Sequence, residues 1–191
     1  WVASSPTVVD GTVYVGSSDN HVYAVDEVTG SGQWRFETGG RVPSSPTVVD
    51  GTVYVGSNDG NLYAVDVGTE IEQWRFETEE ELWASPTVAG GIIYVGSNDG
   101  NLYALDKELG SGQWRFEIDD WVSSSPTVVD GTVYVGSWDD CLYAIRADAD
   151  ATSEDSRILQ GTLNHHDQDV NQSKVYQPET SGGDTEVYTP G

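Results

Sequence analysis

The stretch that decides the fold is Ala24-Val25-Asp26-Glu27-Val28-Thr29-Gly30-Ser31-Gly32-Gln33-Trp34. Its key positions return about forty and about eighty residues later, as Ala64, Asp66, Trp74, Ala104, Asp106 and Trp114. A fixed period of this length, filled with β-branched and aromatic residues, is typical of a repeat architecture in which each unit must stack on its neighbours. The sequence therefore predicts a series of small stacked β-sheets.

Each repeat begins with a predicted β-hairpin. In the first repeat, the apolar run 5–9 and the run 12–16 are joined by Asp10-Gly11, a dipeptide that tolerates positive φ at both positions. In the third repeat Gly90-Gly91 meets the same backbone requirement. A third strand follows, and then an outer strand in which Trp and Phe alternate with Arg and Glu, as at 34–37. Each repeat is thus predicted to be a four-stranded antiparallel sheet.

The spacing Ala-x-Asp-x-x-Thr-Gly-x-x-x-Trp resembles the tryptophan-docking motif of the β-propeller repeats named after pyrroloquinoline quinone (PQQ). The second copy has Glu70 in place of Gly, the third has Leu109 in place of Thr, and the fourth keeps only Ala144. The resemblance implies an all-β propeller, like other WD40-like folds, whose motif Trp residues pack between neighbouring blades. By this resemblance, the residues expected in structural docking are Trp34, Trp74, Trp114, Ala24, Asp26, Gly30, Ala64, Asp66, Ala104, Asp106 and Gly110.

The repeat predicts about four blades. Three complete blades are expected over 1–40, 41–80 and 81–120, and an incomplete one over 121–146 that lacks a Trp strand. Residues 147–191 read as a polar acidic tail, largely irregular, in which 174–177 and 186–189 have strand character. Because propellers of this family usually have seven or eight blades, we expect a partial ring, half of an eight-bladed ring or a small closed ring. The first two leave apolar blade faces open to self-association or to a protein partner.

The charge balance is strongly acidic, with 32 acidic against 8 basic residues and a formal net charge of -24. Such a field argues against binding nucleic acid or an anionic membrane surface, and no apolar run is long enough for membrane insertion. We interpret the acidity as salt adaptation, as in a halophilic archaeon. The chain opens at Trp1 without Met, which suggests a processed product or an excerpt. The sequence does not determine the cellular compartment, although the family resemblance favours an extracellular or cell-envelope location over the cytoplasm.

Residues that break the repeat are the better candidates for a binding site. The linker into each innermost strand and the turn between the second and third strands are predicted to lie on the same side of the ring. The candidate binding mouth there consists of Trp1, Arg41, Trp83, Trp121 and Trp138, with Glu81, His21 and Cys141 nearby. Exposed aromatic side chains can stack a flat ligand or anchor a protein partner. The alternative is that these Trp residues only cap the blade ends.

The sequence contains no recognisable catalytic constellation, and no catalytic or metal-binding residue is predicted. The turn acids Asp19, Asp59, Asp99 and Asp139 are interpreted as turn formers, and His165-His166-Asp167 as a solvated cluster. The single cysteine, Cys141, excludes the adjacent-cysteine disulfide of many quinone dehydrogenases of this family. No cofactor is therefore expected, and PQQ is suggested by the family name alone.

Strict repetition without an embedded site favours a non-catalytic repeat domain that acts as a protein-interaction or ligand-binding scaffold. One alternative is a fragment of a PQQ-dependent quinoprotein dehydrogenase whose catalytic residues lie elsewhere. Another is a scaffold like the outer-membrane assembly lipoprotein that shares these repeats. The sequence therefore favours a role other than catalysis and does not identify a partner.

Overall fold

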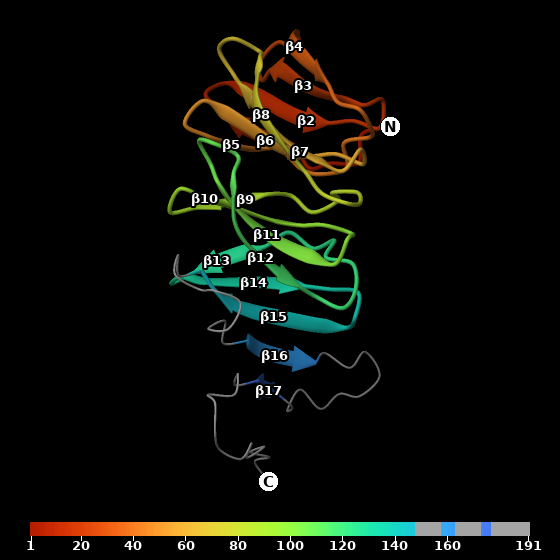
Figure 1. The fold of residues 1–191 in the computed structure, drawn as a ribbon. Helices are drawn as coiled ribbons and strands as arrows, with labels where there is room; N and C mark the ends of the chain where they lie inside the picture. The colour runs from red at the N-terminus through yellow and green to blue at the C-terminus, as the bar shows by residue number, and fades with distance from the viewer. Residues whose placement is uncertain (148–157, 163–172, 177–191) are drawn as a thin grey trace, which may run out of the picture.

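The computed structural model describes residues 1–147, 158–162 and 173–176, whose regular secondary structure consists of β-strands. Four antiparallel sheets follow one another, each with its strands in chain order (Figure 1). Blades 1 and 2 contain β1 (Thr7–Val9), β2 (Thr12–Gly16), β3 (His21–Asp26), β4 (Gly32–Glu37), β5 (Thr47–Val49), β6 (Thr52–Gly56), β7 (Asn61–Asp66) and β8 (Glu72–Glu77). Blades 3 and 4 contain β9 (Thr87–Ala89), β10 (Ile92–Gly96), β11 (Asn101–Asp106), β12 (Gly112–Glu117), β13 (Thr127–Val129), β14 (Thr132–Gly136) and β15 (Cys141–Arg146).

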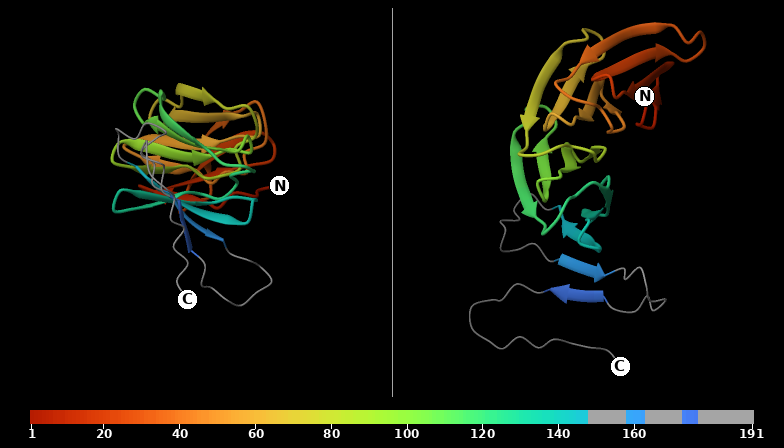
Figure 2. Two further views of the ribbon diagram at one scale, coloured as in Figure 1. Left: turned by 60° about the horizontal axis from the view of Figure 1, so that its bottom comes forward. Right: turned by 90° about the vertical axis from the view of Figure 1, so that its right-hand side faces the viewer.

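The blades are arranged along an open arc (Figure 2). Their innermost strands contact one another in order, β1 with β5, β5 with β9 and β9 with β13. The all-β propeller architecture and the partial ring predicted from the repeat are confirmed. Within the described residues, no helix is long and apolar enough to cross a membrane.

Blade 4 takes additional strands from the tail. Strand β16 (Ile158–Thr162) pairs with β15, and β17 (Ser173–Tyr176) pairs with β16. The outer position is therefore filled by β16, which was not predicted as a strand, whereas β17, which overlaps the predicted strand 174–177, lies one strand further out. The other candidate strand, 186–189, and the cluster 165–167 lie outside the described residues.

The hairpin turns have the predicted backbone. Asp10 and Gly11 adopt φ values of 48° and 79°, and Gly90 and Gly91 adopt 59° and 83°. Positive φ at both central residues matches the right-handed twist of the flanking strands, which is why Asp-Gly and Gly-Gly both serve here. This prediction is confirmed.

The hydrophobic core lies between blades. We call the side of a blade that contacts the preceding blade its leading face and the opposite side its trailing face. On the trailing face of blade 1, Tyr14 and Val22 pack against Val53, Val55 and Tyr63 on the leading face of blade 2. Equivalent clusters join blades 2 and 3 and blades 3 and 4. Each blade is therefore stabilised chiefly by its neighbours, as expected for a repeat protein.

A ladder of hydrogen bonds runs along the innermost strands through the repeated Ser-Pro-Thr segment. The backbone N–H of Ser5 donates to Ser45 Oγ at 2.8 Å, and the Thr7 hydroxyl donates to the Pro46 carbonyl at 2.6 Å. The same two bonds recur from blade 2 to blade 3 and from blade 3 to blade 4. One Ser-Pro-Thr segment per repeat is visible in the sequence, but the hydrogen bonds that it forms between blades were not predicted.

Candidate interaction surface

In every blade the entering linker lies beside the turn between the second and third strands. The Trp138 backbone N–H donates to the Trp121 carbonyl at 3.0 Å, and Asn58 donates to Arg41 at 2.8 Å. Equivalent bonds join Ser18 to Trp1 and Asn98 to Glu81. The candidate mouth residues therefore share one edge of the arc.

Along this edge, the structure brings two of the mouth residues into contact. The rings of Trp121 and Trp138 lie 5.3 Å apart between centroids, and their side chains are 44% and 61% exposed. Trp83, one blade earlier, is 43% exposed and donates its indole N–H to Glu81 Oε2 at 2.6 Å. Trp1 and Arg41 are exposed in the linkers of blades 1 and 2, further along the arc. The aromatic surface is therefore concentrated at blades 3 and 4.

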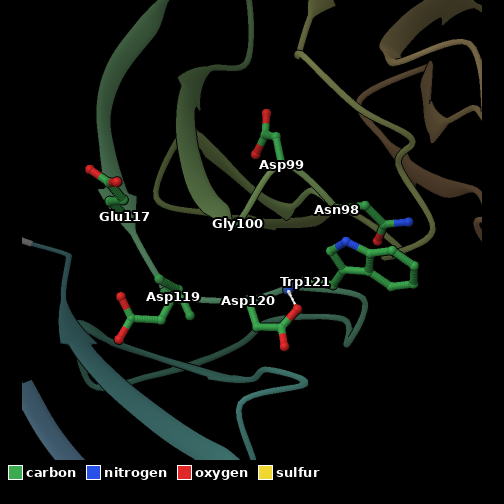
Figure 3. Close-up of a pocket in the computed structure, with 8 residues that line it drawn as sticks. Asn98, Asp99, Gly100, Glu117, Asp119, Asp120 and Trp121 are labelled. Carbon is green, nitrogen blue, oxygen red and sulfur yellow. Dashed lines mark hydrogen bonds between the residues drawn. The ribbon is translucent and has the colours of Figure 1, made fainter.

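A pocket of about 380 Å³ opens beside Trp121 (Figure 3). It lies between the turn that follows β10, the end of β12 and the linker into blade 4. It is lined by Asn98, Asp99, Gly100, Glu117, Ile118, Asp119, Asp120 and Trp121. None of its carboxylates forms an ion pair with a described residue. The sequence does mark the position of this acidic pocket, because Asp119-Asp120 stands where the first repeat has Gly39-Gly40.

The turn acids connect neighbouring blades. Asp59 Oδ2 accepts hydrogen bonds from the Tyr63 hydroxyl at 2.7 Å and from the Gly39 backbone N–H of the preceding blade at 2.6 Å. Its Oδ1 accepts from the Asn61 N–H at 2.9 Å, which closes the turn as predicted for an Asp at this position. Burial alone would raise the pKa of Asp59, but these hydrogen bonds outweigh burial and hold the pKa below its usual range. Among the described residues, no group of acids, His and Cys has the arrangement of a metal site.

The same contacts predict a loss of stability at alkaline pH. Burial, and then the hydrogen bond to the neighbouring Asp, raise the pKa of Tyr63 and of Tyr103 from 10 to about 12. Because the folded chain favours the neutral phenol, these two tyrosines contribute to the free energy of unfolding. Their contribution is complete below pH 10 and is lost as the pH rises towards 12. Spectrophotometric titration should therefore show tyrosines that ionise about two units late, together with loss of the β-sheet circular dichroism signal. In the Asp59→Asn variant, Tyr63 should ionise at a lower pH than in the unchanged chain.

The repeated Trp residues contact the next blade unequally. The Trp74 indole N–H donates to the Lys107 carbonyl at 3.2 Å, and its ring lies against Gly110, where an added Cβ would be 2.4 Å from a ring carbon. Between blades 1 and 2 the glycine position holds Glu70, at φ 64°. There, within residues 1–147, the Trp34 indole N–H makes no hydrogen bond equivalent to that of Trp74.

The remaining motif residues lie at the turn between the third and fourth strands. Asp26 Oδ1 accepts from both the backbone and the hydroxyl of Thr29 at 2.7 Å. Asp66 and Asp106 bind the equivalent positions, Thr69 and Leu109. The motif alanines, Ala24, Ala64 and Ala104, are fully buried, each opposite the motif Trp of its own blade.

Comparison with known proteins agrees with this architecture. Among solved structures, BamB from Moraxella catarrhalis matches with a TM-score of 0.68 and 22% identity, over 76% of this chain and 47% of that one. The computationally designed Ika4 protein matches with a TM-score of 0.68 and 19% identity, over 76% of this chain and 92% of that one. The computationally designed Ika8 protein matches with a TM-score of 0.67 and 18% identity, over 75% of this chain and 45% of that one.

The chain therefore spans about half the length of the BamB structure. No curated protein sequence matches it. The family model described as outer membrane protein assembly factor BamB matches residues 1–69 and 58–153. The chain thus belongs to the PQQ-like β-propeller family that this model describes.

Proposed function

We propose that this chain is a non-catalytic β-propeller repeat domain that serves as a protein-interaction scaffold and binds its partner at the mouth formed by blades 3 and 4. The observation that carries the proposal is the contacting pair Trp121 and Trp138, which are 44% and 61% exposed. Aromatic side chains that stay exposed on a rigid scaffold are enriched among the residues that dominate protein interfaces.

The pocket beside the pair restricts the chemistry of the partner. Its carboxylates, Asp99, Glu117, Asp119 and Asp120, create a negative field at the rim of the aromatic surface. A partner segment with an Arg or Lys side chain next to an apolar one matches both features, because the cation is attracted to the pocket and to the face of an indole ring. We therefore expect a basic peptide segment rather than an acidic one.

The test uses short peptides that contain arginine and one aromatic residue, with acidic peptides of the same length as the comparison. The basic peptides should change the indole fluorescence of the full chain, and Trp138→Ala or Trp121→Ala should weaken their binding about tenfold, which corresponds to about 1.4 kcal/mol. Leu109→Ala is the control, since Leu109 is 74% exposed but lies in the turn between β11 and β12, away from the mouth. Equal binding of acidic peptides, or unchanged binding by both Trp variants, would contradict the proposal.

A second candidate function is a part in outer-membrane protein assembly, which is favoured by the family match over residues 1–153. In that case the basic segment belongs to another component of the assembly, and the chain acts in the cell envelope. The family description supports this candidate, whereas the mouth geometry supports binding in general.

We also propose that the acidic composition is a salt adaptation. A net charge of -24 disfavours the compact state through repulsion between carboxylates. Salt weakens this repulsion, because the Debye screening length falls from about 10 Å at 0.1 M to about 3 Å at 1 M. The midpoint of thermal unfolding should therefore rise steeply from dilute buffer to molar potassium chloride. A midpoint that does not change with salt would rule the adaptation out.

A further inference from the structure

The acidic pocket beside Trp121 lies where the repeat loses a contact that ties the linker to the turn in the earlier blades. In blade 2, the Thr78 hydroxyl donates to the Gly60 carbonyl at 2.9 Å and to the Glu80 carbonyl at 2.7 Å. Ile118 stands at this position in blade 3 and has no hydroxyl to donate. Without this tie, the linker and the turn of blade 3 leave the pocket of about 380 Å³ between them.

One side of the pocket carries carboxylates that are available to a ligand. Asp99 already accepts from the Tyr103 hydroxyl at 2.8 Å, and Asp120 accepts from the backbone N–H of the next residue at 2.7 Å. The carboxylates of Glu117 and Asp119 accept no hydrogen bond and form no ion pair within the described part of the chain. Figure 3 shows these two side chains on the same side of the pocket. That side therefore offers acceptors to a cation.

The other side of the pocket carries a donor without a partner. Asn98 is only 7% exposed, and its Oδ1 accepts from the Ser123 hydroxyl at 3.0 Å. This bond leaves the NH₂ group of the amide to the pocket that Asn98 lines, and the NH₂ group donates to no described residue. Figure 3 shows Asn98 and Trp121 across the pocket from Glu117 and Asp119. Because nearly buried polar groups are normally hydrogen-bonded, the free NH₂ group points to a ligand that brings an acceptor oxygen.

The serine that holds this amide is a further departure from the repeat. The residues at its position in the other three repeats carry no hydroxyl, namely Ala3, Pro43 and Trp83. In blade 2, where Trp83 takes the place of the serine, the equivalent Asn58 has its Oδ1 enclosed without a hydrogen-bond partner among the described residues. Ser123 therefore fixes the orientation of the Asn98 amide, with its oxygen engaged and its NH₂ group available.

From this arrangement we propose that the pocket binds one arginine residue of the partner lengthwise, with its guanidinium at Glu117 and Asp119 and its own main-chain carbonyl at the Asn98 NH₂ group. The guanidinium suits two free carboxylates because its five donors form a planar fork. The neighbouring apolar residue of the partner then lies against Trp121 and Trp138. This inference rests on the proposed function and adds a specificity-determining residue. Asn98 selects an arginine within a polypeptide over a polyamine, which carries the cation without the carbonyl.

The test compares three small probes that are titrated into the full chain and followed by NMR of the indole N–H resonances. N-acetylarginine methylamide should bind about tenfold more tightly than N-acetylcitrulline methylamide, which has the same shape without the charge. It should bind about fivefold more tightly than N-acetylagmatine, which keeps the guanidinium but lacks the main-chain carbonyl that follows the side chain. Equal binding of the arginine and agmatine probes would overturn the role of Asn98.

The Asn98→Asp variant tests the same contact from the side of the protein. It replaces the NH₂ donor by an acceptor of the same size, so the preference for the arginine probe over the agmatine probe should disappear, even if the added charge strengthens the binding of both. The control Asn20→Asp adds the same charge in the turn of blade 1 and should keep the fivefold preference. The repeat accepts Asp at this position, since Asp140 of blade 4 has φ 65° where Asn20 has 71°. A preference that survives Asn98→Asp would contradict the inference, and circular dichroism checks that both variants are folded.

The arginine pocket and the proposed function can fail separately. If longer basic peptides bind and respond to Trp121→Ala, but the three probes bind alike or not at all, the mouth binds basic peptides and the arginine pocket is wrong. If neither the peptides nor the probes bind, both proposals are wrong.

Discussion

Trp74→Ala should lower the free energy of unfolding by about 3 kcal/mol, the lower end of the range for Trp-to-Ala changes because the ring is only partly buried. The substitution removes the indole that packs on Gly110 and the hydrogen bond to the Lys107 carbonyl. It also leaves a void beside Tyr54, whose ring centroid is 5.8 Å from that of Trp74. Urea unfolding followed by circular dichroism measures the change without depending on the indole that has been removed.

Two other Trp residues provide matched comparisons. Trp34→Ala should cost less than Trp74→Ala, because Glu70 replaces the glycine on which the ring would pack. Trp83→Ala should cost under about 1 kcal/mol, since Trp83 is 43% exposed at the mouth. Equal losses for all three variants would mean that Trp74 has no special docking role.

The fold could be predicted because nearly every local signal is repeated. Asp-Gly turns, alternating strands and one Trp per repeat each indicate the same four-stranded sheet, and this agreement outweighs the ambiguity of any single short strand. The outer strand of blade 4 could not be predicted in the same way. Residues 158–162 have no counterpart in the other repeats, and their position depends on the pairing edge that β15 leaves open.

The candidate site could be predicted only in part. The topology indicates which linkers and turns share an edge, so the proposed mouth follows from the repeat. The contact between Trp121 and Trp138 depends on side-chain conformations that no periodicity encodes. The acidic pocket likewise needs three segments to converge, although the replacement of Gly39-Gly40 by Asp119-Asp120 marks its position in the sequence. The binding role of these residues remains a prediction.

The glycine of the motif allows a comparison of two positions with the same backbone and different neighbours. Gly30 and Gly110 have φ values of 69° and 65°, so alanine at either position costs about 1 to 2 kcal/mol for the left-handed backbone. At Gly30 an added Cβ meets nothing within 4 Å, whereas at Gly110 it lies 2.4 Å from the Trp74 ring. The difference between the two variants therefore isolates the packing of Trp74 against the next blade.

Gly110→Ala should destabilise the chain by about 3 kcal/mol, since overpacking adds about 1 to 3 kcal/mol to the backbone cost. In a Trp74→Ala background the cost should fall to that of Gly30→Ala, because the ring that clashes is gone, and the double-mutant cycle gives the coupling directly. The converse change, Glu70→Gly, should stabilise by about 1 kcal/mol, because it removes a side chain from φ 64°. Equal costs for Gly30→Ala and Gly110→Ala would show that the ring yields freely and that indole packing contributes little to the stacking of blades.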